Sequence, residues 1–305
     1  MPEEKAVHVP DSANLPPLPL AEWSDTQATL HMWMQVIGKI QLKLTPLVNH
    51  WWNVTFLLNA RGMGTQALHY TGGTIEIRFD FIDHDLVLAT SRGETRRLVL
   101  RPQTVADFYR EVMQALSDLG VGVKIWPVPV ELSDPIPFEQ DTVHRSYDRE
   151  AVARFWHIFS WADAVLKEFR AAFIGKSSPV HFFWGSFDLA VTRFSGRRAP
   201  ERPGADRITR EAYSHEVSSA GLWPGGGPLK APAFYSYAAP EPAGFAEWHV
   251  MPAAAFYHPE LKEFLMMYDD VRQAPFPRDA LLQFLQTTYD AAADLGHWER
   301  GALER

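Results

Sequence analysis

The residues best able to do chemistry together lie in the second half of the chain. Two pairs of a histidine and a carboxylate occur there, His181 with Asp188 and His215 with Glu216. Imidazole titrates near neutral pH, so either histidine could act as a general base that a carboxylate orients. The sequence therefore offers four candidate catalytic residues, which are His215, Glu216, His181 and Asp188.

Large aromatic residues surround these groups in the sequence. They are Trp184, Trp223, Tyr235 and Tyr237, and Arg193 lies among them. Aromatic walls with a few convergent polar groups are typical of small-molecule pockets, and a guanidinium group suits carboxylate or phosphate. We therefore predict that these five residues bind a substrate, with Arg193 holding an anionic group. The alternative is a large aromatic core, because Trp and Tyr are commonly half-buried.

Hydrolase and metal motifs are incomplete. Residues 185–188 lack the second glycine of a nucleophile elbow, so Ser186 could act only if the fold brings Asp188 and a histidine to it. The alternative is a bend, which glycine often marks in a strand. His215 and Glu216 could ligate a metal together with His181 and Asp188. Adjacent strand residues point to opposite faces, however, so no metal site is predicted, and no cofactor is identified.

Composition excludes several classes of protein. The chain has 305 residues, a net charge of −8 and no cysteine, which excludes disulfides, thiolate metal sites and a cysteine nucleophile. An acidic balance argues against a nucleic-acid partner. No apolar run approaches the roughly 20 residues that span a bilayer, and no signal peptide is apparent. We expect a soluble, cytoplasmic protein without a membrane partner, and its oligomeric state is open.

The hydrophobic pattern predicts a mixed fold. Apolar residues recur at helical spacing over residues 24–44, 104–119, 148–173, 259–268 and 278–295, and Ser24 with Gln27 fits a capping box. Alternation over residues 52–58, 75–81, 180–194, 213–219 and 234–237 predicts strands with one face on a core. We predict an α+β fold of two similar halves, each a largely antiparallel sheet packed by long amphipathic helices.

Proline-rich stretches divide the chain. Residues 1–22 are a predicted disordered tail, residues 23–130 an N-terminal α+β half, residues 131–147 a connector and residues 148–305 a C-terminal α+β half. Residues 48–52 and 180–184 follow corresponding helices and share a short histidine–aromatic string. This echo suggests a distant duplication, with a chance match as the alternative.

Several longer strings carry a family resemblance. Residues 181–190, HFFWGSFDLA, together with residues 213–216, 234–237 and 240–242, resemble the motifs of DUF5996, a bacterial domain of unknown function. Residues 48–55 and 79–84 are similar to its N-terminal motifs. The resemblance covers nearly the whole chain after the tail. It implies no role for any residue, because the family has no assigned reaction.

The favoured function is the binding or transformation of a small polar or anionic molecule in an aromatic-lined pocket of the C-terminal half. Whether the protein is an enzyme or a non-catalytic binder is open at this point. The alternative is a protein-interaction or scaffold role, which a large exposed apolar patch would favour.

Overall fold

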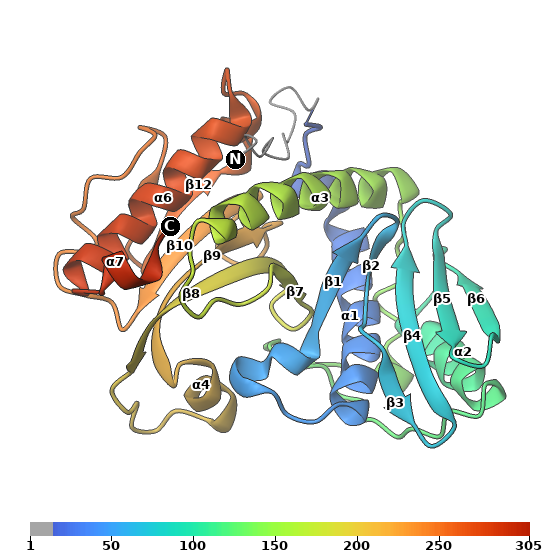
Figure 1. Cartoon of the computed structure of the whole chain (residues 1–305). Coiled ribbons are helices and arrows are strands. Elements are labelled where there is room, and N and C mark those ends of the chain that lie inside the picture. The colour runs from blue at the N-terminus through green and yellow to red at the C-terminus, as the bar shows by residue number, and fades with distance from the viewer. Residues whose placement is uncertain (1–14) are drawn as a thin grey trace, which may run out of the picture.

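The computed structural model describes residues 15–305 (Figure 1). Most of the predicted disordered tail, residues 1–14, lies outside the described residues. Residues 15–22 differ from the prediction, because Leu15 and Leu18 are buried and Tyr268 donates a hydrogen bond to the Pro16 carbonyl at 2.8 Å. Helix α1 (Leu20–Leu44) begins four residues before Ser24, the first residue of the predicted capping box. Gln27 instead donates to the Gly225 carbonyl at 2.7 Å.

The strands of residues 15–305 form one twelve-stranded sheet in which neighbouring strands are antiparallel. The first six are β1 (Thr55–Asn59), β2 (Gly62–Gly64), β3 (Leu68–Tyr70), β4 (Gly73–Asp80), β5 (Asp85–Thr90) and β6 (Thr95–Val99). The last six are β7 (His181–Phe183), β8 (Asp188–Arg198), β9 (His215–Trp223), β10 (Ala233–Ala239), β11 (Phe256–His258) and β12 (Glu263–Met267). Their order is β11-β12-β10-β9-β8-β7-β1-β2-β4-β5-β6, and β3 pairs with β4.

The sheet is continuous across the two parts of the chain, whereas the sequence predicted a sheet for each half. The junction is the pairing of β1 with β7, where Thr55 lies opposite Phe183 and Phe56 opposite Phe182. From this junction the strands run outward on both sides, and each series is followed by a helix, α2 (Val105–Asp118) or α6 (Pro277–Leu295). The mixed helix-and-sheet fold is confirmed, while the similarity of the two halves stays a prediction.

Long helices pack on one face of the sheet. Helix α3 (Arg149–Ala171) contacts β8 and β9, α6 contacts β9 and β10, and α1 contacts both α2 and α3 (Figure 1). The predicted helix starts are confirmed for α2 and α3: the Thr104 side chain accepts from the Asp107 amide, and the Asp148 side chain from the Glu150 amide. On β7–β10, helices α3 and α6 leave the other face to part of α1 and to shorter segments.

Strand β8 shows how the sheet separates its two faces. Leu189, Val191 and Arg193 point to the helices, because successive strand side chains alternate and the Arg193 guanidinium lies 3.5 Å from the Phe169 ring centre in α3. Asp188 and the other even-numbered residues therefore point to the opposite face, which we call the cavity face.

One predicted helix is a strand instead. Residues 259–268 contain β12, followed by the short helix α5 (Tyr268–Arg272). Phe264 and Met266 are buried, and Leu265 lies opposite Tyr235 of β10. Pairing with β10 overrides the helical spacing here, because a short apolar run suits either element. The change of element turns Glu263 to the cavity face.

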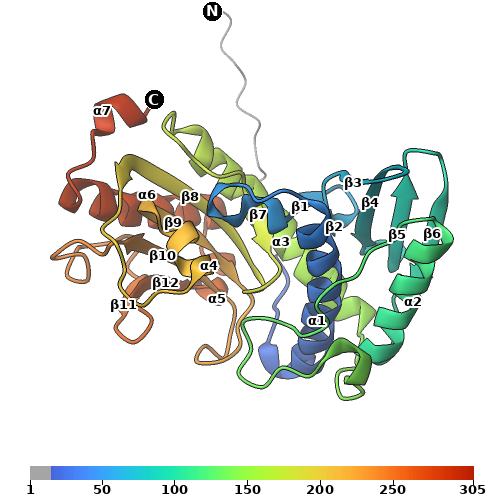
Figure 2. The same ribbon diagram turned by 90° about the horizontal axis from the view of Figure 1, so that it is seen from below.

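Two short segments cover the cavity face. They are the 3₁₀ segment η1 (Asn49–Val54) and helix α4 (Arg207–Ala212), which lies in the connection between β8 and β9 (Figure 2). The Trp51 indole N–H donates to the Ile208 carbonyl at 3.2 Å, and the His50 amide donates to the Glu211 carboxylate at 3.1 Å. These bonds hold η1 and α4 together over the sheet.

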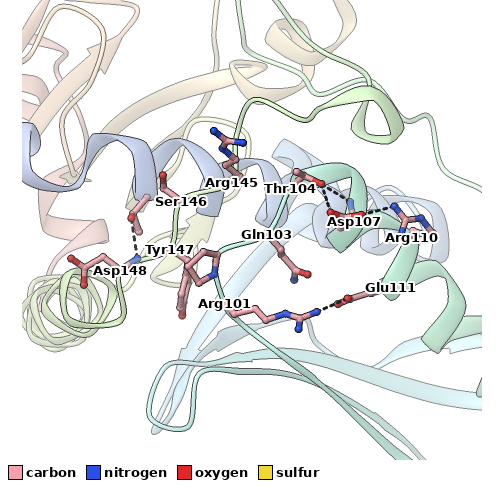
Figure 3. A pocket seen from close by; sticks show the side chains of 12 residues that line it. Arg101, Gln103, Thr104, Asp107, Arg110, Glu111, Arg145, Ser146, Tyr147 and Asp148 are labelled. Carbon is pink, nitrogen blue, oxygen red and sulfur yellow. Dashed lines mark hydrogen bonds and ion pairs between the residues drawn. The ribbon is translucent and has the colours of Figure 1, made fainter.

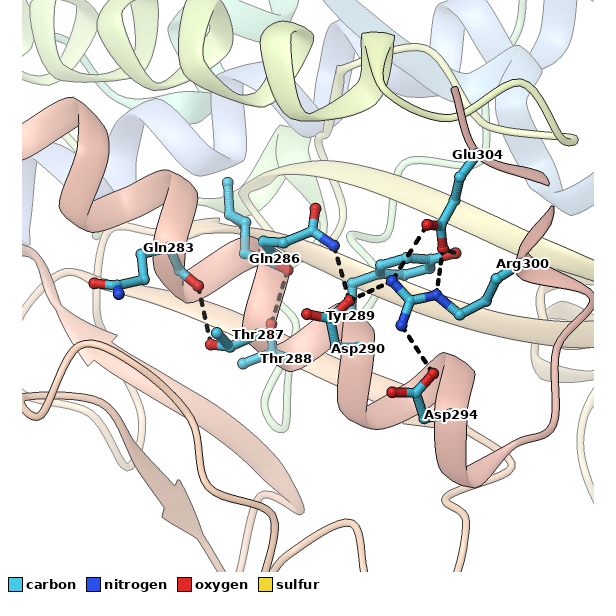
Figure 4. A network of polar contacts seen from close by, with 10 residues as sticks. Gln283, Gln286, Thr287, Thr288, Tyr289, Asp290, Asp294, Arg300 and Glu304 are labelled. Carbon is cyan, nitrogen blue, oxygen red and sulfur yellow. Dashed lines mark hydrogen bonds and ion pairs between the residues drawn. The ribbon is translucent and has the colours of Figure 1, made fainter.

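The C-terminus is fixed by an ionic network on α6 (Figure 4). Arg300 of α7 (Arg300–Leu303) forms ion pairs with Asp290 at 2.7 Å, with Asp294 at 2.8 Å and with Glu304 at 2.6 Å. Glu304 also accepts from the Tyr289 hydroxyl at 2.8 Å. Three carboxylates around one guanidinium hold the last residues against the helix face of the sheet.

None of the helices in residues 15–305 has the length and apolarity needed to cross a membrane.

Candidate functional site

Two adjoining cavities lie on the cavity face, and we call them together the groove. The η1-side cavity has a volume of about 500 Å³ and is lined by η1, α4 and β7–β10. The β12-side cavity has a volume of about 910 Å³ and is lined by α1, residues 225–227, β9, β10 and β12. The residues that line both are Glu131, Gly185, Ser186, Asp188, Tyr213, Tyr235 and Tyr237.

Small residues make the floor between the two cavities. Tyr235 of β10 lies opposite Gly221 of β9, which lies opposite Ala190 of β8. A Cβ atom at Gly221 would lie 2.5 Å from the Tyr235 hydroxyl oxygen. The missing side chain therefore lets the Tyr235 phenol lie across β9 and donate a hydrogen bond to the Asp188 carboxylate.

Asp188 is the central polar group of the groove. Its side chain is only 8% exposed and accepts hydrogen bonds from the Ser186 and Tyr235 hydroxyls. Burial raises the pKa of the carboxyl, and these two hydrogen bonds act in the opposite direction. Among the ion pairs of the described residues, none involves Asp188.

Two further carboxyl groups, which the sequence did not single out, complete an acidic set. The Glu131 carboxylate lies against Gly185, where a Cβ atom would overlap it. Burial and then the charge of Asp188 raise the pKa of Glu131, and the same two causes raise the pKa of Glu263 to about 7. Glu131 lay in the predicted connector and Glu263 in the predicted helix. Residues 264–267 are a continuous apolar run, which the sequence alone does not distinguish from a helix.

Helix α1 holds Glu131 in place. The Gln35 side chain donates to the Val130 carbonyl and accepts from the Val130 amide, both at 2.8 Å. The predicted connector is therefore a wall of the groove at this point. Near its middle, Phe138 is fully buried, so the connector packs on the core rather than separating two bodies.

Aromatic rings surround the carboxyl groups. The Tyr235 and Tyr237 rings are stacked with centres 6.1 Å apart, and the Tyr237 and Tyr213 hydroxyl oxygens lie 3.1 Å apart. Trp223 lines the β12-side cavity. Trp184 lines the η1-side cavity and packs on Gly38 of α1, where a Cβ atom would overlap its indole ring.

The backbone around the groove is unusual. Of the seven non-glycine residues with positive φ in the described chain, four line the groove: His50, Trp51, Glu131 and Phe187, with φ between 56° and 61°. Left-handed backbone at residues with a Cβ costs on the order of 1 kcal/mol each and clusters at functional sites. The strain is concentrated where the cavities are.

The η1-side cavity has basic groups at its far end. Lys39 of α1 lines it, and burial lowers the pKa of this lysine. The Lys176 amine lies 2.6 Å from His50 Nε2. Burial and then the charge of Lys176 lower the pKa of His50. Both ring nitrogens of His50 already have partners, so Lys39 is the basic side chain that lines this cavity.

Asp188, Trp184, Trp223, Tyr235 and Tyr237 are the predicted site residues that the fold brings together in the groove. Strand geometry and packing place the other four predicted residues outside the groove. They are His181, Arg193, His215 and Glu216.

Arg193 lies on the wrong face for a groove ligand. Its guanidinium lies between the rings of Phe169 and Tyr289, 3.5 and 4.3 Å from their centres, and donates to the Phe169 carbonyl. Burial lowers the pKa of Arg193 to about 10. Arg193 and Asp188 are five residues apart on β8, so their side chains point to opposite faces of the sheet. Arg193 therefore does not hold an anionic group in the groove, contrary to the prediction from the sequence.

His215 and Glu216 do not form a catalytic pair. Glu216 pairs with Arg197 at 2.7 Å and accepts from Ser195 at 2.8 Å, on the face opposite to the groove. The His215 ring packs at the edge of His50, with ring centres 5.7 Å apart. Adjacent residues of β9 point in opposite directions, so the two side chains cannot act on one molecule.

His181 is a core residue beside the groove. It is 1% exposed, and its ring packs on Phe183 with centres 4.7 Å apart. Burial lowers its pKa to about 3, which keeps the imidazole neutral. No hydrogen bond joins it to Asp188 among the described residues, so the predicted pair of His181 and Asp188 is not formed.

Another cavity, of about 870 Å³, lies at the start of α2 (Figure 3). Arg101 pairs there with Glu111 at 2.9 Å, and Arg110 pairs with Asp107 at 2.6 Å. These charges neutralise each other on the surface, whereas the carboxyl groups of Asp188, Glu131 and Glu263 in the groove form no ion pair among the described residues. We therefore place the candidate site in the groove.

In residues 15–305, no group of three or more His, Asp or Glu residues could hold a metal ion.

Residues 15–305 match a family of unknown function, DUF5996, and the chain belongs to this family. The resemblance that the motifs indicated is thereby confirmed. No curated protein and no solved structure is significantly similar to the chain.

Proposed function

We propose that the protein binds a small polar molecule in the groove, with Asp188 as the central recognition group. The observation that carries this proposal is a buried carboxyl group that has hydroxyl donors but no cation, at the point where two cavities meet. Burial of such a group costs free energy, and a ligand that hydrogen-bonds to it would offset part of that cost. The support for an anionic ligand weakens, because Arg193 lies on the other face.

The groove also has the chemistry for proton transfer. General acid–base catalysis works best when the pKa of the acid or base lies near the working pH, and Glu263 has a pKa of about 7. Asp188 lines the same cavity and is hydrogen-bonded to Ser186. An enzyme that moves a proton between ligand and carboxyl group is the form of this proposal that we favour over simple binding.

Two further predictions remain proposals. Similar halves are supported by the strand order, which runs outward from the β1–β7 junction on both sides. A scaffold role is the alternative function, and the large exposed hydrophobic residues that would favour it are spread along the chain, as with Ile82, Trp126 and Phe276.

A thermal-shift screen against a metabolite library tests the proposal, because a ligand that binds only the native state raises the melting temperature. We expect a hit whose shift is lost in Asp188→Asn and kept in Glu216→Gln. The second variant is a matched control, since Glu216 pairs with Arg197 on the opposite face. Hits that shift both variants equally would place the binding site elsewhere, and a library without hits would contradict the proposal.

A further inference from the structure

The charges that line the β12-side cavity are of one sign. Its lining includes the carboxyl groups of Glu131, Asp188 and Glu263, and no lysine or arginine among the described residues. His31 also lines it, but burial lowers the pKa of this imidazole to about 4, and its Nε2 lies 2.8 Å from the Gly185 carbonyl oxygen. At neutral pH this histidine therefore brings no positive charge.

Cations near the site lie outside this cavity. Arg202 and Lys262 line a neighbouring cavity of about 460 Å³ that shares Glu263, and the Arg202 guanidinium lies 4.4 Å from the Tyr213 ring centre. Lys39 lines the η1-side cavity. The carboxyl groups of the β12-side cavity thus have no lysine or arginine beside them in its lining.

The remaining wall is suited to a positive charge. Trp223, Tyr213, Tyr235 and Tyr237 line the same cavity, and the face of an aromatic ring attracts ammonium groups. A carboxylate held near such rings is the usual way that proteins recognise amines, since the rings cover the alkyl part of the ligand while the carboxylate meets the charge.

The Trp184 indole is a second polar group beside the groove. Trp184 is 4% exposed and lines the η1-side cavity, yet its indole N–H has no acceptor among the described residues. A buried donor without a partner costs about 1–3 kcal/mol. The indole nitrogen lies against Gly38, and the Trp23, Trp33 and Trp156 indoles also lack acceptors, so the ligand is inferred from the β12-side cavity alone.

We propose that the groove takes an organic ammonium compound, with its positively charged nitrogen in the β12-side cavity. This inference rests on the proposed function and names the class of its ligand. Asp188, Glu131 and Glu263 meet the ammonium group, and the tyrosine and tryptophan rings enclose its carbon substituents.

Matched probes that differ in charge test the inference. We would titrate the full chain calorimetrically with choline and with 3,3-dimethylbutan-1-ol, in which carbon replaces the charged nitrogen. A second pair is 2-phenylethylamine and 2-phenylethanol. We expect each amine to bind at least tenfold more tightly than its neutral partner. That preference should fall at least tenfold in Asp188→Asn and in Glu263→Gln, and stay unchanged in Glu216→Gln.

The outcomes separate this inference from the function on which it rests. Neutral probes that bind as well as the amines, with both losing affinity in Asp188→Asn, would overturn the ammonium inference and keep the groove as a binding site. Amines whose affinity is the same in Asp188→Asn would overturn it as well. If no probe binds but a neutral or anionic library compound does, only the inference fails, and if nothing binds both fail. Circular dichroism of each variant checks folding, and Glu131→Gln serves if another variant does not fold.

Discussion

At the scale of single residues, the groove carboxyl groups matter most: Asp188 is buried, Glu263 is half-buried, and neither is in an ion pair among the described residues. Glu263 shows the consequence most clearly, because its pKa of about 7 lies well above the value near 4.3 for a free glutamate. The folded protein therefore binds a proton at this carboxyl over a pH range in which the unfolded chain has released it. Stability from this group is present at low pH and is lost as the pH rises toward and through 7.

The first prediction follows from this difference. In Glu263→Gln the ionisation is absent, so its free energy of unfolding relative to the unchanged protein should rise between pH 5 and pH 8, by on the order of 1–3 kcal/mol. Urea unfolding at several pH values measures it. The free energies of the two proteins must be subtracted at each pH. His181, whose pKa burial lowers to about 3, makes the free energy of unfolding rise with pH in both proteins, and the subtraction removes this contribution. A difference that does not change with pH would contradict the assigned environment.

At the scale of elements, strand geometry explains which parts of the site could be predicted. The types of residue were sufficient for Asp188, Trp184, Tyr235 and Tyr237, because aromatic residues gather around a few polar groups in this part of the sequence. Periodicity also predicted α2, α3 and α6. Which face of each strand meets the cavity depends on pairing and on the helices above it, and this is why Arg193 was assigned to the wrong side.

The remaining misses also have pairing as their cause. Glu263 was hidden because residues 259–268 were expected to form a helix, and only the partnership with β10 makes residues 263–267 a strand. Glu131 comes from the connector, which no local pattern places over β8. The pairing of β1 with β7 joins residues far apart in sequence, so the continuous sheet could not be inferred from either half alone.

The two faces of β8 give a prediction at this scale. Arg193→Met should lower the free energy of unfolding by about 2–4 kcal/mol, because the side chain packs between Phe169 and Tyr289 and donates to a buried carbonyl. It should leave the affinity for a groove ligand within about twofold, since it lies on the helix face. Urea unfolding and calorimetry of the same variant measure both quantities. A loss of affinity without a loss of stability would restore Arg193 as a ligand-binding residue.

At the scale of the whole molecule, the groove is built from both parts of the chain. The β7–β10 and β12 strands supply its floor, while α1, η1 and Glu131 supply walls from the N-terminal part. Trp184 needs Gly38 of α1 as its packing surface, and β7 has β1 as its outer partner. The two parts of the chain therefore build one groove together.

This arrangement predicts that the halves are not independent. A fragment of residues 148–305 would expose the β7 edge and the apolar groups that pack on α1, so we expect it to lack cooperative unfolding or to aggregate. Thermal melting followed by circular dichroism, with the full chain as the control, measures this. A sharp two-state transition in the fragment would show that residues 148–305 fold alone, and it would contradict this prediction.

The most direct measurement is a crystal structure of the protein with the strongest ligand from the thermal-shift screen. The account predicts electron density in the groove, with a polar atom of the ligand within hydrogen-bonding distance of the Asp188 carboxylate. Density at another place, such as the cavity at the start of α2 (Figure 3), with the groove holding only water, would contradict it.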